Sequence, residues 1–377
     1  MSTSFVAVDP GALLVIDSPP PPPAAGSHRA RVWRGPSPNR WASAAALILC
    51  LVGRQLEAGD RLVVRRPGSQ GRIELQGEIL EFRGEEVSFQ ASADEPIQTW
   101  RGPEILLVEP DRREPHQRGR QAISQDAGQA GADLEQALSE EPRPWVRREI
   151  LSDLVRCALF QQDFAVAGSR YLAIENSDPE TRHLAVIPLR WTPALPARDD
   201  RAAAIKWLRS KSDTAKLMGA SQLLLDPEFR TEAEAALRQI ARGDSLRLQP
   251  VAQWQLRRTE AFSGRPRLSD LRYWQKSFDQ LPVELQAGPA YLLAEALDRR
   301  AESALAASYW LRLVTHEAAD LRLLAEALER GAEALQTAGQ TSEAAALRDE
   351  RRRRFPDLDR PADPPGVPPP RKRTVDR

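Results

Sequence analysis

The feature that most constrains this chain is a pattern that starts at an alanine and recurs four times. In each copy, apolar residues follow the alanine with the spacing of one face of a helix. A proline, or a break in the helical pattern, comes about twelve residues after the alanine. The alanines of the first two copies, Ala130 and Ala167, are 37 residues apart, and those of the last two, Ala306 and Ala344, are 38 apart. The copies read Ala130, Leu134, Ala137, Leu138, Pro142; Ala167, Tyr171, Ile174, Pro179; Ala306, Trp310, Leu313, Ala318; and Ala344, Leu347, Pro356. A sequence period of this length is typical of stacked helical hairpins, which form surfaces that bind other proteins.

Small residues occupy the positions at which paired helices must approach closely. They are Ala158, Ala294 and Ala332 on expected first helices, and Ala167, Ala306 and Ala344 on second helices. With the apolar residues Val155, Tyr171, Ile174, Leu297, Trp310, Leu313, Leu328 and Leu335, and with Gly339 and Pro356 around the last hairpin, the pattern resembles tetratricopeptide repeats. The resemblance implies a mainly α fold, an α-solenoid of paired antiparallel helices that binds a protein or peptide on its concave face. Side chains of first helices would line that face, and the candidates are Arg118, Arg148, Glu295 and Arg330.

The central part of the chain, 181-286, keeps helical spacing without a clear copy of the repeat. Helices are predicted near 199-211, 213-225, 228-241, 245-261 and 269-280, with Ser212 or Asp213 capping the second. Trp207, Trp254 and Trp274 are expected to anchor the packing of this part. Trp191 lies in an extended connection and is either a packing residue or an aromatic binding spot.

Residues 59-110 change to a period of two, which predicts a β module. The expected strands are 61-65, 72-83, 85-90, 96-100 and 104-109, separated by turns rich in Gly and Pro. Five short strands in about fifty residues suggest a small SH3-like or Sm-like barrel. Arg61, Arg65, Arg66 and Arg72 are read as a solvated strand face rather than as a nucleic-acid contact.

An apolar run from Trp41 to Val52, flanked by arginines, has the length of a signal-peptide core and is short for a bilayer span. We expect 41-58 to be a signal peptide or a membrane anchor, with a true start near Val32 as one explanation of the long leader before it. The protein is then exported to the periplasm, the membrane or the exterior; the alternative is a buried helix of a cytoplasmic protein.

Composition and motifs indicate a protein without a reaction centre. Lys plus Arg and Asp plus Glu both number 53, so no global field attracts nucleic acid. Four dispersed histidines do not indicate a metal site, and phosphate loops and nucleophile elbows are missing from the sequence. Cys157 falls on an apolar helical face and is expected to be a buried core residue. No cofactor is expected.

The sequence therefore predicts a non-catalytic interaction scaffold of the bacterial cell envelope that binds an unidentified protein or peptide. The order of an export signal, a β module and degenerate helical repeats is also similar to that of many uncharacterised bacterial envelope proteins. Two alternatives stay open: an envelope-assembly component that self-associates through the β module, and an enzyme whose site is built from scattered residues. The expected divisions are a Pro-rich leader 1-40, the signal or anchor 41-58, the β module 59-110, helical repeats 114-180, a degenerate region 181-286, further repeats 287-357 and a basic tail 358-377.

Overall fold

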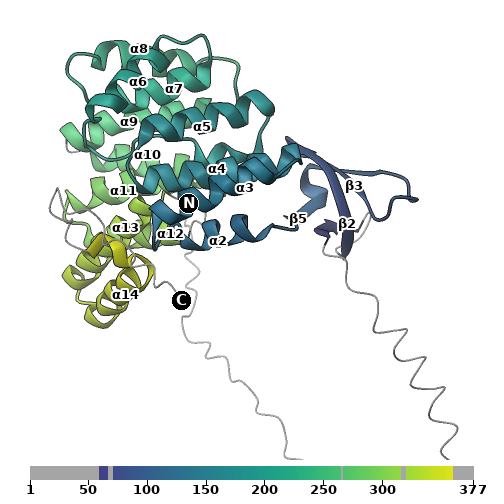
Figure 1. Ribbon diagram of the computed structural model, residues 1–377. Helices are drawn as coiled ribbons and strands as arrows, with labels where there is room; N and C mark the ends of the chain where they lie inside the picture. The colour runs from purple at the N-terminus through teal and green to yellow at the C-terminus, as the bar shows by residue number, and fades with distance from the viewer. Residues whose placement is uncertain (1–58, 67–70, 265, 316–319, 360–377) are drawn as a thin grey trace, which may run out of the picture. The chain divides into compact units, whose positions relative to one another are not determined.

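The computed structural model describes residues 59–66, 71–264, 266–315 and 320–359. In this part the chain is mainly helical, with thirteen α-helices following a five-stranded antiparallel sheet (Figure 1). The predicted leader, the apolar run from Trp41 to Val52 and nearly all of the basic tail lie outside the described residues. None of the helices described here has both the length and the apolarity that a membrane crossing requires.

The sheet contains five strands in the order β4-β3-β2-β1-β5, and all neighbours are antiparallel. The strands are β1 Asp60–Arg65, β2 Arg72–Arg83, β3 Glu86–Gln90, β4 Gln98–Arg101 and β5 Ile105–Glu109, with the short 3-10 helix η2 Gly102–Glu104 between the last two. The five predicted runs are confirmed to within two residues at each end. The alternation of apolar and polar residues predicted these strands correctly because one face of the sheet is buried, with Leu62, Val64 and Ile79 at 0% exposure.

Gly77 allows the long strand β2 to change partners halfway along its length. Up to Gly77 the strand pairs with β1, and from Glu78 onward it pairs with β3. A Cβ at Gly77 would lie only 2.4 Å from the carbonyl oxygen of Gln90 and 2.7 Å from the Cα of Ala91. A residue without a side chain is therefore needed where the two halves of the sheet meet.

The helices follow one another with short connections. They are α2 Glu114–Ala122, α3 Ala127–Glu140, α4 Pro144–Phe160, α5 Phe164–Ser177, α6 Arg198–Leu208, α7 Asp213–Leu223, α8 Arg230–Ile240, α9 Gln249–Ser263, α10 Leu268–Asp279, α11 Ala287–Asp298, α12 Ser303–Val314, α13 Leu321–Thr337 and α14 Thr341–Arg354. Three further 3-10 helices are η3 Arg182–Val186, η4 Val283–Leu285 and η5 Pro356–Asp359. The five helices predicted between residues 199 and 280 are confirmed, and Ser212 caps α7 by accepting a hydrogen bond from the backbone N–H of Ala215.

The same turn joins three helix pairs, α4 to α5, α11 to α12 and α13 to α14. Gln162, Ala301 and Gly339 each adopt a positive φ, of 63°, 62° and 84°, and each lies five residues before a buried alanine of the helix that follows. The following residue closes the turn with a backbone hydrogen bond to the residue five places earlier. This bonding pattern is the Schellman motif, in which glycine is preferred because it tolerates positive φ. Two of these three turns thus keep the same geometry without the glycine.

The small residues predicted at helix contacts are all buried. Ala167, Ala294, Ala306, Ala332 and Ala344 are 0% exposed and Ala158 is 4% exposed. Their helices contact each other in the expected pairs, α4 with α5, α11 with α12 and α13 with α14. The three tryptophans expected to anchor packing, Trp207, Trp254 and Trp274, are buried as well.

A contact between α4 and α13 joins parts of the chain that are far apart in sequence. The Nε of Arg322 donates a hydrogen bond to the carbonyl oxygen of Phe160, and the rings of Phe160 and Phe355 lie 6.2 Å apart. In an open solenoid each repeat contacts only its neighbours. Here the pair formed by α4 and α5 also contacts the pair formed by α13 and α14.

The sheet is attached to the start of α4 by hydrogen bonds in a buried region. The indole N–H of Trp145 donates to the carbonyl oxygen of Ile79 at 2.8 Å. The carboxylate of Asp60 accepts hydrogen bonds from the backbone N–H groups of Ile79 and Asp111 and from the Arg143 guanidinium. The β module and the helices therefore share one core, which extends from Leu62 to α14.

Candidate functional site

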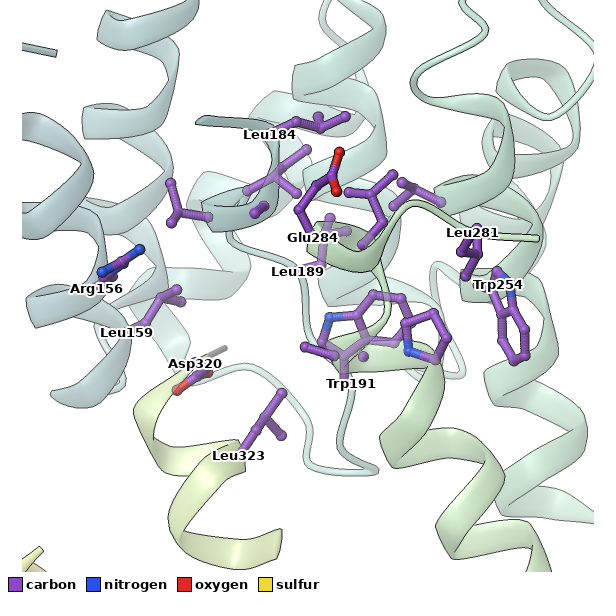
Figure 2. A pocket seen from close by; sticks show the side chains of 18 residues that line it. Arg156, Leu159, Leu184, Leu189, Trp191, Trp254, Leu281, Glu284, Asp320 and Leu323 are labelled. Carbon is purple, nitrogen blue, oxygen red and sulfur yellow. The ribbon is translucent and has the colours of Figure 1, made fainter. Parts of the chain in front are cut away.

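An apolar cavity of about 50 Å³ lies where α4, α11, α13 and the non-helical segment after η3 converge. Figure 2 shows Arg156 and Leu159 on one side, Trp254 and Leu281 on the other, and Asp320 and Leu323 entering from α13. Because the walls are mainly leucine and tryptophan, the cavity suits an apolar group. We refer to it as the apolar cavity.

Trp191 forms part of the cavity wall and lies against the beginning of α11. A Cβ at Gly288 would come within 1.9 Å of the Trp191 indole, so the ring packs directly on the glycine. The predicted extended connection is confirmed, since no helix or strand is assigned between Ile187 and Ala197. Trp191 is half-buried, and it therefore contributes to packing while one part of it borders the cavity.

A second, larger hollow adjoins the apolar cavity and is lined by charged side chains. It has a volume of about 420 Å³ and lies between the turn joining α4 to α5, residues 190–194, and the helices α13, α14 and η5. We call it the charged groove. It shares Leu159, Asp320 and Leu323 with the apolar cavity, so the two hollows are neighbours, and we refer to them together as the central site.

Arginines and carboxylates line the charged groove together. The arginines are Arg190, Arg322 and Arg351, and the acids are Asp320, Glu326 and Glu329. Glu329 lies 3.6 Å from Arg351, and Glu326 accepts a hydrogen bond of 2.8 Å from the Tyr291 hydroxyl. These pairings give the groove fixed hydrogen-bonding groups beside an apolar pocket, which is the usual composition of a binding site.

Asp320 belongs to both hollows and caps α13 by accepting a hydrogen bond from the backbone N–H of Arg322. Burial raises the pKa of its carboxyl group to about 6, against the opposing effects of the backbone N–H groups of Arg322 and Leu323 and of the Arg322 and Arg190 charges. The folded protein therefore favours the protonated carboxyl group. Its contribution to stability is present below the ordinary pKa of 3.8 and is lost as the pH rises through about 6.

We predict that Asp320→Asn stabilises the protein at pH 7.5 by about 1–2 kcal/mol, because asparagine caps the helix without carrying a charge. Part of Asp320 remains accessible to solvent, which keeps this gain below the full effect of the pKa shift. Urea unfolding at several pH values measures it, and the difference from the wild type should vanish towards pH 4. Asp163→Asn, at the exposed cap of α5, is the matched control. An Asp320→Asn variant that is less stable than the wild type at pH 7.5 would contradict this prediction.

The four side chains predicted to line a binding face are placed in three different surroundings. Arg118 is about half exposed on α2 and pairs with Glu114 at 2.8 Å and Asp133 at 3.2 Å. Glu295 and Arg330 are brought together, at 3.3 Å, between α11 and α13. None of the four borders the apolar cavity or the charged groove.

Arg148 is buried and forms an internal link between the sheet and the helices. Its guanidinium donates hydrogen bonds to Glu81 and to the carbonyl oxygen of Phe82 on β2, and to the Ser177 hydroxyl at the end of α5. The side chain is 3% exposed. Arg148 therefore lies on a face of α4 that the β module covers, and its donors are engaged in hydrogen bonds inside the protein.

Cys157 is confirmed as a buried core residue, 3% exposed. Its thiol donates to the carbonyl oxygen of Ala127, and burial raises its pKa to about 11. A thiol with this pKa stays protonated at neutral pH and is a poor nucleophile. In the part of the chain that the structure describes, three or more metal-binding side chains do not come together.

The residues of the central site were missed by sequence reasoning, apart from Trp191. Arg190, Asp320 and Leu323 come from segments more than 120 residues apart, and neither hollow is confined to one repeat. The available signal was the proline-flanked, non-helical stretch around Trp191, which interrupts an otherwise helical region. No family model, curated protein or solved structure matches this chain.

Proposed function

We propose that this protein is a non-catalytic interaction scaffold that binds a segment of another protein at its central site. The observation that supports this function is that the apolar cavity and the charged groove are neighbours and share Leu159, Asp320 and Leu323 in their walls. A peptide lying in the groove would insert one apolar side chain into the cavity while its backbone meets the polar groups beside it.

We further propose that the helices form a tetratricopeptide-like α-solenoid whose concave side is partly enclosed. Support comes from the identical turns at Gln162, Ala301 and Gly339 and from the buried alanines five residues after them. The contact of Arg322 with Phe160 then brings the ends of the helical array together around the central site. A partner segment would be held between repeats rather than along one open face.

For the β module we propose an SH3-like barrel that supports the helical array. The strand order β4-β3-β2-β1-β5, a long β2 shared by both halves, and a 3-10 turn before β5 are all typical of such barrels. Its hydrogen bonds to Trp145, Arg143 and Arg148 favour a structural role in holding α4. Placement in the cell envelope remains part of this proposal and rests on the apolar run from Trp41 to Val52.

Filling the apolar cavity tests the proposed function. Ala287, at the start of α11, borders the cavity, and Ala287→Phe would occupy it with a benzyl group. The matched control is Ala202→Phe, the same substitution at an exposed position of α6. In chemical crosslinking from intact cells, the wild type and the control should capture the same dominant partner, and the filled variant should capture about tenfold less of it.

Thermal unfolding of all three proteins establishes that the filled variant remains folded. If a folded Ala287→Phe protein captures as much partner as the wild type, the central site is not where the partner binds. If crosslinking recovers no dominant partner with the wild type, the scaffold function itself is rejected.

A further inference from the structure

Arg190 carries a buried guanidinium that forms no ion pair with an acidic side chain in the part of the chain that the structure describes. The residue is 7% exposed, and its Nε donates a hydrogen bond to the Gln222 amide oxygen at 2.7 Å. Its plane lies over the Phe164 ring, 4.2 Å from the centroid. Among the described residues, its two terminal nitrogens meet no hydrogen-bond acceptor and no carboxylate within ion-pair distance. Arg190 lines the charged groove, so these nitrogens are available from that side.

Arg258 places a second positive charge behind the first. It is 1% exposed and donates to the carbonyl oxygens of Ser221 and Thr192 and to the side chain of Gln255. Its Nε is buried without a partner in the described residues. Burial and the nearby charge of Arg190 lower the pKa of Arg258 to about 9, so Arg258 is charged at neutral pH.

Two buried cations without a counterion are costly for the folded protein. Arginine retains its proton in proteins, and a buried charge is normally paired or coordinated. The carboxylates that act on Arg190 from a distance are Asp200 and Asp320. Asp200 accepts a hydrogen bond from the backbone N–H of Ala165, and Asp320 caps α13, so both are already used elsewhere. The arrangement lacks one negative group at the wall of the groove.

We propose that the Arg190 end of the charged groove binds a carboxylate of the partner, next to the apolar side chain that enters the cavity. This inference rests on the proposed function and adds the chemical class of the segment that is recognised. A guanidinium presents two parallel N–H groups that match the two oxygens of a carboxylate. The acids Asp320, Glu326 and Glu329, which also line the groove, disfavour a doubly charged phosphate more than a singly charged carboxylate.

Short capped peptides with the full chain test this recognition. The probes are acetyl-Leu-Glu-amide, its neutral match acetyl-Leu-Gln-amide, acetyl-leucine with a terminal carboxylate, and inorganic phosphate as a competitor. Ligand-observed NMR titrations give the affinity of each probe. We expect at least one carboxylate probe to bind the wild type about tenfold more tightly than the Gln peptide. Comparing the affinities of the Glu peptide and of acetyl-leucine shows whether the site prefers a side-chain carboxylate or the carboxylate at a chain end.

The variant Arg190→Gln should remove this preference, and Arg190→Lys should restore part of it because lysine keeps the charge but not the planar fork. Arg201→Gln is the control, since Arg201 is an arginine already paired with Asp226 and Glu228. Thermal unfolding without ligand should leave Arg190→Gln at or above the wild-type melting temperature, because the substitution removes an unbalanced buried charge.

Three results would overturn the carboxylate site. In the first, the Glu, Gln and terminal-carboxylate probes bind the wild type equally well and none of them binds Ala287→Phe. This result would support the scaffold function and reject recognition of a carboxylate. Phosphate that displaces the peptides through Arg190 while the carboxylate probes show no preference would assign the site to another anion. A markedly lower melting temperature of Arg190→Gln would show that the fold itself balances the charge.

Discussion

Arg148→Met is expected to lower the free energy of unfolding by about 3–5 kcal/mol, the loss typical when one partner of a buried ion pair is removed. The substitution leaves the carbonyl oxygen of Phe82 and the Ser177 hydroxyl without their donor, and leaves Glu81 without its cation. It also leaves Asp178, whose carboxylate lies 4.0 Å from Arg148, as an unbalanced buried charge. Urea unfolding followed by circular dichroism measures the change.

Arg118→Met is the matched control for this experiment. Arg118 is also a predicted candidate for the binding face, yet its side chain is 47% exposed, so water reaches one end of both its ion pairs: Glu114 is 81% exposed, and Asp133 is 11% exposed. Exposed ion pairs contribute little, so the loss should stay below about 1 kcal/mol. If both substitutions have the same small effect, Arg148 does not hold the sheet on the helices.

Gly219→Ala is expected to destabilise the protein by about 2 kcal/mol, although alanine is the better helix former. Gly219 lies on α7, and a Cβ there would be 2.4 Å from the backbone nitrogen of Leu208 and 2.5 Å from the carbonyl oxygen of Ala204. These are backbone atoms of α6 that cannot rotate away, so the two helices must separate. Separation opens the core between them, and thermal or urea unfolding reports the loss.

Gly131→Ala is the same substitution at a helical position with room for it. Its Cβ would lie 3.6 Å from the Cys157 sulfur, which is ordinary van der Waals contact. Here the higher helix propensity of alanine should raise stability by up to about 1 kcal/mol. The two substitutions are thus expected to have opposite signs. A neutral Gly219→Ala protein would show that α6 and α7 do not approach as closely as described.

The elements of the fold were predicted well wherever the local pattern and the burial agree. The strands followed from the alternation that places Leu62, Val64 and Ile79 on one face of the sheet. The second helices followed from alanines such as Ala306, because only a small side chain fits where two axes meet. The turns at Gln162 and Ala301 were harder to recognise, since neither carries the glycine that usually marks positive φ.

Most residues of the candidate site could not be predicted from local sequence patterns. A helical pattern distinguishes an apolar face from a polar one, but it does not say what will cover the polar face. Arg148 was therefore expected in a groove, although β2 lies over it and accepts its hydrogen bonds. Arg190 and Asp320 were overlooked for the converse reason, because only the approach of α13 to the segment before α6 places them around one hollow.

The sequence by itself determined the order of a β module and a helical array, the positions of most strands and helices, and the small residues at which helices meet. These properties depend on neighbours within one or two turns of the chain, where spacing translates directly into a face or a contact. Only the tertiary structure decided that α4 meets α13, that Arg148 is internal, and that an apolar cavity adjoins a groove lined by the buried Arg190. Such features arise from contacts between segments that are far apart in sequence, 66 residues for Arg148 with Phe82 and 162 for Arg322 with Phe160, and no local periodicity encodes which distant surfaces will meet.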